Sequence, residues 1–407
     1  MLRAARRRLL TAVGIGATAS ITGVTVPAQI GTIRGSVPQD FGARGDGRTD
    51  DTAALLRWRD AIEAGAVGDL PAGRYKVREG ELVFRVRDGD TGAPVIRTAG
   101  CRRSVFVARG TSDAPVIEFR NEVPYRIAHG GSIDGIGIED AAPGTVGEAR
   151  VGLALSGLAF TRFGPIHGRG FGGDLVRIVR REIDGNPDPF HVALCRFEGI
   201  EADRCHGWAF NNDNGVGLNG CEIFGVRSIL CGAGAIRSGG AGNRYAAISL
   251  AGSKGWAVER YRAGGTASRE LYERLELDHP EYGLKLGALT SFEISHIRLI
   301  HRWLDEHQRY VPKIGVQLGG IELSRLENGN VGIIHRIDPG PKSADLGTFY
   351  DFSNDSNIID VTVNAWLQGH LTRESGQSIR PDSVKVDRLS PHARITLRFD
   401  SVQYDQR

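Results

Sequence analysis

The stretch that decides the fold covers residues 37–53. It reads Val37-Pro38-Gln39-Asp40-Phe41-Gly42-Ala43-Arg44-Gly45-Asp46-Gly47-Arg48-Thr49-Asp50-Asp51-Thr52-Ala53. Its glycines turn the chain, because glycine adopts backbone conformations that are closed to other residues. Thr49 or Asp50 then offers a side-chain oxygen that can cap the first turn of a helix. The stretch therefore predicts a tight loop that leads directly into a helix.

This helix is expected over about residues 51–64, where apolar residues recur at helical spacing. One side of it carries Ala54, Trp58, Ala61 and Ile62. Further along, the run Leu70-Pro71-Ala72-Gly73-Arg74-Tyr75 contains a turn signal and leads into a strand.

Loop, helix and turn together resemble the opening of the pectate-lyase superfamily, D-F-G-A-x-G-D-G-x-T-D-D-T-x-A followed by L-P-x-G-x-Y. The resemblance implies an all-β fold, a single-stranded right-handed parallel β-helix (a solenoid) with an N-terminal capping α-helix. Residues 37–407 would form this domain, with the cap at 37–77. The superfamily includes lyases, hydrolases, epimerases, tailspikes and non-catalytic members, so it indicates the fold and leaves the activity open.

The composition also favours many short strands joined by turns. The chain has 56 glycines among 407 residues, about twice the usual 7%. They follow no three-residue period, which excludes collagen. With 41% hydrophobic residues and 24% charged residues, the chain can build a core and stay soluble.

One internal repeat can be measured from the cysteines. Cys195 to Cys221 and Cys205 to Cys231 are both 26 residues, a length that fits one coil of a solenoid. The same offset aligns Phe197 with Ile223, Gly199 with Gly225 and Ile200 with Val226. Each cysteine pair is then either a disulfide or a stack of two buried thiols, since neighbouring strands lie within disulfide range. No clean repeat is visible elsewhere, and 271–310 and 337–356 are interpreted as excursions from the β-helix.

Residues 1–28 are interpreted as an export signal. Basic residues precede an apolar stretch from Leu9 to Val26 and a small-residue site at Val26-Pro27-Ala28. The run Arg6-Arg7-Arg8-Leu9-Leu10 resembles a twin-arginine signal. A periplasmic or secreted protein with no stable membrane span is therefore expected. Removing four arginines and no acids changes the formal charge from +3 to −1 (3 − 4), which gives no support to nucleic-acid binding.

Two linked segments resemble motifs of the polygalacturonases, N-T-D-G-I/V-D and G-D-D-C-I/V-A-I/V-K-S-G. They are Asn211-Asn212-Asp213-Asn214-Gly215-Val216-Gly217 and Cys231-Gly232-Ala233-Gly234-Ala235-Ile236-Arg237-Ser238-Gly239. Asn214, Ala233 and Gly234 stand where the family has its catalytic aspartates. The resemblance thus implies a polygalacturonase-like skeleton without the acids of standard hydrolysis.

A different carboxylate pair lies in Leu275-Glu276-Leu277-Asp278-His279. Strand alternation places Leu275 and Leu277 inward and the two acids on the outer face. Their spacing, about 7 Å between Cα atoms, is compatible with the about 6.5–9.5 Å carboxyl separation of inverting glycosidases. Alternating acids on a strand are also common on an ordinary solvated face.

Eliminative cleavage of an acidic polysaccharide requires a cation to neutralise the uronate and a base to remove a proton. The candidate catalytic residues are Glu276, Asp278, Arg237, Arg244, Tyr245 and His279, and the candidate substrate-binding residues are Asn212, Asp213, Arg227 and His191. No metal site or cofactor is predicted, and Ca²⁺ is expected only for a lyase.

The leading hypothesis is an exported carbohydrate-active β-helix that cleaves a polysaccharide by β-elimination. The alternatives are a glycoside hydrolase with a non-standard carboxylate pair and a non-catalytic polysaccharide-binding or structural β-helix. Either a monomer or a homotrimer fits these hypotheses, and neither nucleic acid nor membrane is expected as a partner.

Overall fold

In the computed structural model, residues 35–407 form one compact unit. The structure describes residues 35–86, 93–110, 112–123, 128–141, 150–180, 182–183, 186–187, 192–212, 217–260, 267–286, 289–290 and 292–302, and beyond 302 the strand backbones given below. The predicted export signal, residues 1–28, lies outside the described residues. No helix in the described part of the chain is long and apolar enough to cross a membrane.

The elements follow one another as short strands after a single α-helix. The first half contains η1 (Pro38–Phe41), β1 (Asp46–Asp50), α1 (Thr52–Glu63), β2 (Gly68–Leu70), β3 (Gly73–Val77), β4 (Val83–Val86), β5 (Val95–Thr98), β6 (Ser104–Ala108), β7 (Ile117–Asn121), β8 (Ala128–His129), β9 (Ser132–Ile133), β10 (Ile136–Asp140), β11 (Val151–Ser156), β12 (Leu158–Ala159), β13 (Arg162–Phe163), β14 (Ile166–Arg169), β15 (Asp174–Ile178), β16 (Glu182–Ile183), β17 (Asn186–Pro187), β18 (Val192–Ala193), β19 (Arg196–Asp203) and β20 (Trp208–Asn212). The second half contains β21 (Leu218–Asn219), β22 (Glu222–Cys231), β23 (Gly234–Ser238), β24 (Arg244–Arg260), β25 (Ala267–Ser268), β26 (Leu271–Leu286), β27 (Leu289–Thr290), β28 (Glu293–Arg302), β29 (Ile314–Leu318), β30 (Leu326–Asp338), β31 (Thr348–Asp351), β32 (Ile358–Leu371), β33 (Val386–Asp387), β34 (Ala393–Phe399) and β35 (Gln403–Tyr404).

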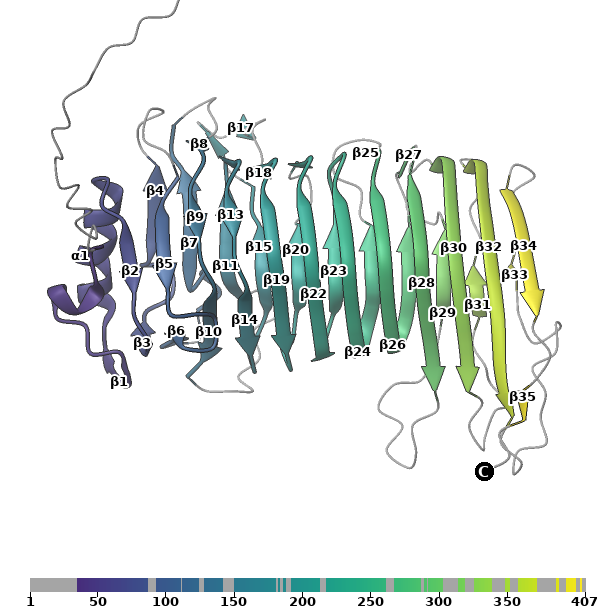
Figure 1. Cartoon of the computed structure of the whole chain (residues 1–407), viewed down its shortest axis with the longest axis horizontal. Coiled ribbons are helices and arrows are strands. Elements are labelled where there is room, and N and C mark those ends of the chain that lie inside the picture. The colour runs from purple at the N-terminus through teal and green to yellow at the C-terminus, as the bar shows by residue number, and fades with distance from the viewer. Residues whose placement is uncertain are drawn as a thin grey trace, which may run out of the picture. The chain divides into compact units, whose positions relative to one another are not determined.

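The strands stack coil upon coil in a right-handed parallel β-helix, as expected from the sequence (Figure 1). On one face β19 pairs with β22, β22 with β24, β24 with β26 and β26 with β28, all in parallel. A second face is formed by β15, β20, β23 and the later halves of β24 and β26. Long strands such as β24 therefore turn the corner between the two faces.

The 26-residue repeat is confirmed in register. Phe197 pairs with Ile223 and Ile200 with Val226. The four cysteines of the repeat are buried free thiols, and the backbone N–H of Cys195 donates to Sγ of Cys221 over 3.4 Å. The aligned cysteines thus form two stacks in the core, without disulfides in this structure.

The interpretation of 271–310 and 337–356 as excursions is wrong for the described residues. β26 and β28 pair in parallel within the stack, β30 extends to Asp338, and β31 pairs with β29 and β33. The described parts of these segments are therefore strands of the β-helix. Residues 303–313, 339–347 and 352–357 lie outside the described residues.

The entry motif is a structural loop. Gly42, Gly45 and Gly47 all have positive φ, between 63° and 95°, in the region that favours glycine. The buried carboxylate of Asp51 accepts hydrogen bonds from the N–H groups of Arg44 and Gly45, at 2.7 and 3.0 Å. Asp51 is also the N-cap of α1, one residue beyond the predicted Thr49 or Asp50.

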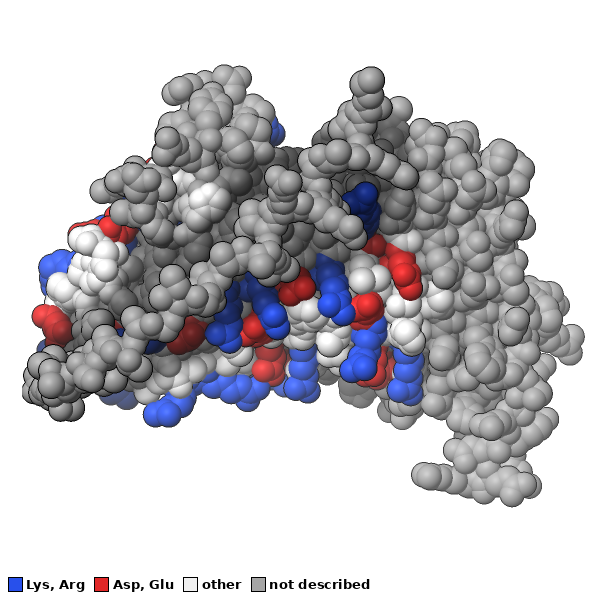
Figure 2. All heavy atoms as spheres, turned by 45° about the horizontal axis from the view of Figure 1, so that its top comes forward, with Lys and Arg blue, Asp and Glu red and all other residues white. Residues whose placement is uncertain are grey.

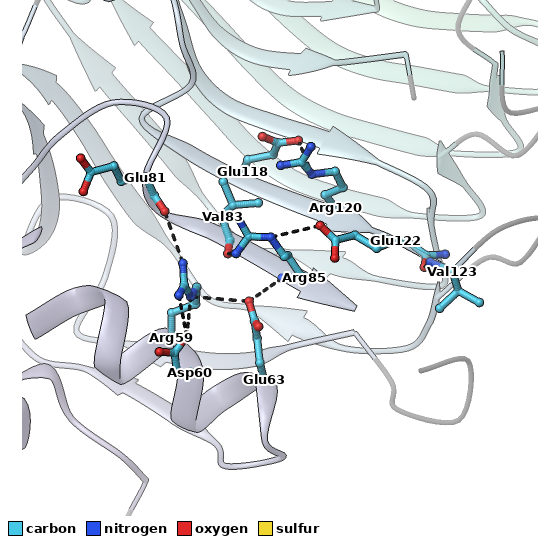
Figure 3. Close-up of polar contacts among 11 residues, drawn as sticks. Arg59, Asp60, Glu63, Glu81, Val83, Arg85, Glu118, Arg120, Glu122 and Val123 are labelled. Atoms are coloured by element: carbon cyan, nitrogen blue, oxygen red, sulfur yellow. Dashed lines mark hydrogen bonds and ion pairs between the residues drawn. The ribbon is translucent and has the colours of Figure 1, made fainter. Parts of the chain in front are cut away.

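Helix α1 covers the N-terminal end of the stack (Figure 1). Its buried side includes Leu55, Trp58 and Ile62. Figure 3 shows how its polar side contacts the first coils: Glu63 accepts a hydrogen bond from the N–H of Arg85 over 2.7 Å, and Arg85 pairs over 3.1 Å with Glu122, which directly follows β7. The predicted capping helix is therefore confirmed.

Left-handed residues line up in columns at the corners of the coils. One column contains Gly199, Gly225, Ala247, Arg274 and His296; another contains Gly170, Arg204, Leu230, Gly252 and His279; a third contains Gly130, Phe160, Leu194, Gly220 and Gly242. Each corner requires φ near +50° to +90°. Glycine meets this requirement without strain, which explains part of the glycine content, but other residues meet it here too.

Gly240 should tolerate no side chain. Its φ is +111°, and an added Cβ would lie 2.0 Å from the carbonyl oxygen of Leu218 on the neighbouring coil. We expect Gly240→Ala to lower the free energy of unfolding in urea by about 2 kcal/mol. Gly65→Ala is the control, since Gly65 has φ +99° but nothing within 4 Å. An equal loss in both variants would assign the whole effect to backbone strain.

Candidate functional site

A groove of about 260 Å³ crosses the first face of the β-helix. Four charged residues line it: Arg227, Glu276, Asp278 and Arg298. They come from β22, β26 and β28, with Ser249 of β24 between them. The structure thus places three of the predicted site residues, Arg227, Glu276 and Asp278, on one concave surface.

Strand register builds the groove. Arg227 pairs with Ser249, Ser249 with Glu276, and Glu276 with Arg298. Neighbouring strands lie about 4.8 Å apart, so the two arginines are about 14 Å apart along the stack at their backbones. Leu275 and Leu277 are fully buried beneath the groove, as alternation predicted, and this fixes Glu276 and Asp278 on its open side.

Charges on neighbouring coils of this face are mostly paired. Figure 2 shows basic side chains alternating with acidic ones along the stack. At the edge of the groove, Arg102 donates to both carboxylate oxygens of Glu201 at 2.8 Å, and Arg227 lies 3.8 Å from the same carboxylate. The hydrogen bond from Arg102 lowers the pKa of Glu201.

Glu276 and Arg298 differ from these pairs. Both side chains are exposed. Although they are neighbours in register, neither has an ion pair within 4.0 Å among the described residues. A guanidinium and a carboxylate that form no ion pair with the described part of the chain therefore face the groove, where a ligand could bind both.

His279 lies beside the groove at a left-handed corner, with φ 54°. Its Nε2 is 3.6 Å from Oδ1 of Asp278, and its side chain is 14% exposed. The two groups are within ion-pair distance but share no hydrogen bond.

The remaining predicted residues do not converge on the groove. Arg244 donates to Glu273 over 2.7 Å, and its guanidinium lies over the ring of Phe224. Arg237 belongs to β23 on the second face and pairs with Glu259 over 3.3 Å. Both arginines join neighbouring coils.

The prediction that Tyr245 is a catalytic residue is wrong. It is fully buried, stacked on Tyr272 with ring centroids 4.8 Å apart, and burial raises the pKa of its phenol. A side chain inside the stack cannot reach a polymer outside it, so Tyr245 is a core residue. Asn212 is also buried, and its Nδ2 donates to the carbonyl oxygen of Gly239. Asp213 and His191 lie outside the described residues.

The polygalacturonase-like pattern stays a prediction, because residues 213–216 lie outside the described residues. Among the described residues, no group of three or more His, Cys, Asp or Glu side chains is arranged to hold a metal ion.

Sequence reasoning missed Arg298 and Ser249. The sequence feature that could have revealed them is an offset of 22 residues between neighbouring coils. This offset aligns Glu276 with Arg298 and Arg227 with Ser249. Arg102 gave no local signal, since it contacts Glu201 across 99 residues of chain.

No protein-family model and no curated protein matches the chain. Solved structures do resemble it. The surface protein and adhesin PfbA of Streptococcus pneumoniae is 14% identical with a TM-score of 0.50, over 91% of this chain and 97% of PfbA. ORF18 of Geobacillus virus E2 is 13% identical with a TM-score of 0.49, over 90% of this chain and 61% of the viral protein.

The A-module of the mannuronan C-5 epimerase AlgE6 of Azotobacter vinelandii is 13% identical with a TM-score of 0.47, over 90% of this chain and all of the module (100%). At such identities a likeness concerns the fold alone. The chain is a right-handed parallel β-helix protein, and the resemblance to the pectate-lyase superfamily is confirmed at the level of the fold.

Proposed function

We propose that the protein is a carbohydrate-active β-helix that binds an acidic polysaccharide in the groove and cleaves it by β-elimination. The observation that carries this proposal is the groove itself, in which Arg227 and Arg298 flank Glu276 and Asp278. An extended polymer can lie along the stack and contact several coils at once. The guanidinium of Arg298 has no ion-pair partner among the described residues and suits a sugar carboxylate.

Elimination needs two roles from these side chains. Arg298 would neutralise the uronate carboxylate and make the neighbouring C–H more acidic, while Arg227, three strands away, would bind a more distant carboxylate of the polymer. His279, whose Nε2 lies 3.6 Å from Oδ1 of Asp278, would remove that proton as the general base. The C–O bond on the adjacent carbon would break, a C=C bond would form in the sugar, and the leaving oxygen would take a proton from water to become a hydroxyl. If Ca²⁺ assists, Glu276 and Asp278 supply the oxygen ligands that this ion prefers.

Hydrolysis is the second candidate, and a specific observation favours it. Glu276 and Asp278 lie two residues apart on one strand and line the same groove. Their Cα spacing of about 7 Å leaves room for a water between the carboxyl groups of an inverting enzyme. In this case one acid would protonate the glycosidic oxygen and the other would activate the water.

The reaction products distinguish elimination from hydrolysis and from binding without cleavage. Purified protein is incubated with oligogalacturonate, oligomannuronate and neutral oligosaccharides. Ultraviolet absorbance from unsaturated uronate ends is expected for elimination, and new reducing ends without that absorbance would indicate hydrolysis. Binding without any product would contradict both enzyme hypotheses and leave a non-catalytic polysaccharide-binding protein.

Arg298→Gln is expected to weaken binding of the acidic oligosaccharide about tenfold or more, since a hydrogen bond to a charged group contributes about 1.5–3 kcal/mol. Isothermal titration calorimetry measures the change. Arg196→Gln serves as the matched control, because Arg196 is an exposed arginine of the same face outside the groove. Equal affinity of both variants for the acidic oligosaccharide would contradict the groove as its binding site.

We further propose that the protein acts outside the cytoplasm, as a monomer or a homotrimer. The support is the signal-like sequence of residues 1–28. Fractionation of the expressing cells tests the first part, and sedimentation tests the second.

A further inference from the structure

A second polar row lies on the other face of the same coils. Arg237 of β23 pairs in register with Glu259 of β24, and Glu259 with Lys285 of β26. Glu259 receives both cations: its Oε2 is 3.3 Å from Nε of Arg237, and its Oε1 accepts a hydrogen bond from Nζ of Lys285 over 3.1 Å. These side chains are only 11–25% exposed, whereas Arg227 in the groove is 61% exposed.

Two aromatic rings adjoin this row. Trp256 and Tyr282 are neighbours in register on β24 and β26, with ring centroids 5.0 Å apart and planes inclined by 39°. Both residues are partly exposed. Nζ of Lys285 lies 5.8 Å from the centroid of Trp256. Lys285 belongs to the outer row, and this contact brings the partly exposed indole within reach of that row.

On the preceding coil, Gly234 allows a close approach to the backbone of Trp256 and to the ring of Trp208. Gly234 lies next to Trp256, and a Cβ added to Gly234 would be 2.0 Å from the carbonyl oxygen of Trp256 and 2.7 Å from a ring carbon of Trp208. The column therefore requires glycine at this position and runs Trp208, Gly234, Trp256, Tyr282. Its packing fixes the aromatic surface in place.

This combination has the chemistry of a sugar-binding surface. A partly exposed aromatic face accepts the C–H side of a pyranose ring, while a few fixed polar groups bind hydroxyls and set its orientation. Glu259 offers acceptor oxygens and Lys285 offers donors, and their ion pairs hold them in one geometry. Since the charges are mutually paired, the surface favours hydroxyl groups over a net ligand charge.

We propose that Trp256, Tyr282, Glu259 and Lys285 form a second carbohydrate-binding subsite, for a hydroxyl-bearing pyranose ring. It lies on the same coils as the groove but beyond the corner at Gly252 and Gly255. The subsite holds sugar without taking part in bond cleavage. It goes beyond the proposed function and does not depend on it.

The probes are hexasaccharides of galacturonate, mannuronate, glucose and xylose, titrated into the full-length protein while tryptophan fluorescence is followed at low and high salt. At least one probe is expected to change the fluorescence with little dependence on salt, since no unpaired charge contacts the ring. Trp256→Ala is expected to weaken this binding about tenfold, in line with the loss of an aromatic contact at a binding surface. Lys285→Met, which keeps an apolar stem beside the indole, should also weaken it.

Phe224→Ala is the matched control, an aromatic residue on the first face between Arg196 and Arg244, and it should leave this binding unchanged. Thermal melts of all variants exclude unfolding, and Trp256→Phe replaces Trp256→Ala if the latter does not fold. The proposal would be overturned if none of the four hexasaccharides changed the fluorescence. It would also be overturned if both Trp256→Ala and Lys285→Met bound the hexasaccharide with the affinity of the wild-type protein. Arg298→Gln separates the two sites, because failure of the groove alone would leave the salt-independent binding intact.

Discussion

Replacing Arg150 by methionine is expected to lower the free energy of unfolding by about 3–5 kcal/mol. The guanidinium is fully buried between coils, where Nη2 lies 2.8 Å from Oε1 of Glu79 and Nη1 donates to Asp140. It also lies over the ring of Phe171. Methionine would fill part of the volume but leave two carboxylates buried without their counter-ion. Urea unfolding followed by circular dichroism measures the loss.

Two further variants isolate the cause. Arg162→Met removes an arginine of the exposed pair with Glu198 and should cost at most about 1 kcal/mol. Adding Glu79→Gln and Asp140→Asn to Arg150→Met should recover part of the loss, because the uncompensated charges disappear. If Arg150→Met costs no more than Arg162→Met, the buried network does not hold these coils together.

The free energy of unfolding should fall as the pH rises through the pKa of Glu270. The substitution Glu270→Gln should remove this decline. Burial raises the pKa of Glu270 from 4.5 to about 7. The folded state therefore binds this proton more tightly than the unfolded state does. The resulting stabilisation is complete below pH 4.5 and is lost as pH rises to about 7 and above. A shift of this size corresponds to about 3 kcal/mol.

Glutamine resembles the protonated acid: its oxygen can accept from Nδ2 of Asn243, and its amide N–H can donate to the hydroxyl of Tyr272, which can in turn donate to Ser238. We therefore expect Glu270→Gln to match the wild-type protein near pH 4 and to exceed it by up to about 3 kcal/mol at pH 8. Unfolding free energies across this range provide the measurement. The control Glu293→Gln, at an exposed position, should show the same dependence of the unfolding free energy on pH as the wild-type protein. If Glu270→Gln also showed that dependence, protonation of Glu270 would not be coupled to folding.

The entry motif and the cysteine repeat made the fold predictable. The 26-residue offset gave the correct register because Gly199 and Gly225 mark the same corner. Beyond them the corner is occupied by Ala247, Arg274 and His296. A search for glycine turns does not detect such corners, and for this reason the sequence alone predicts an excursion over residues 271–310.

The strand register of the other coils could not be predicted from the sequence, because the coils differ in length. Successive coils advance from Arg196 to Glu222, Arg244, Leu271 and Glu293, steps of 26, 22, 27 and 22 residues. With these steps Tyr245 aligns with Ile223 in the core, and Arg298 aligns with Glu276 in the groove. The acid pair was predictable from alternation within one strand, whereas the arginine beside it depends on the next coil.

Unequal coil length has a consequence for how such a protein can change. The extra residues of a long coil leave the strand register intact, so whole coils are units that can be duplicated or deleted without rebuilding the faces. Each added coil would lengthen both faces by about 4.8 Å. The length of each face is therefore adjustable by gene duplication within the chain, independently of the chemistry at any one position.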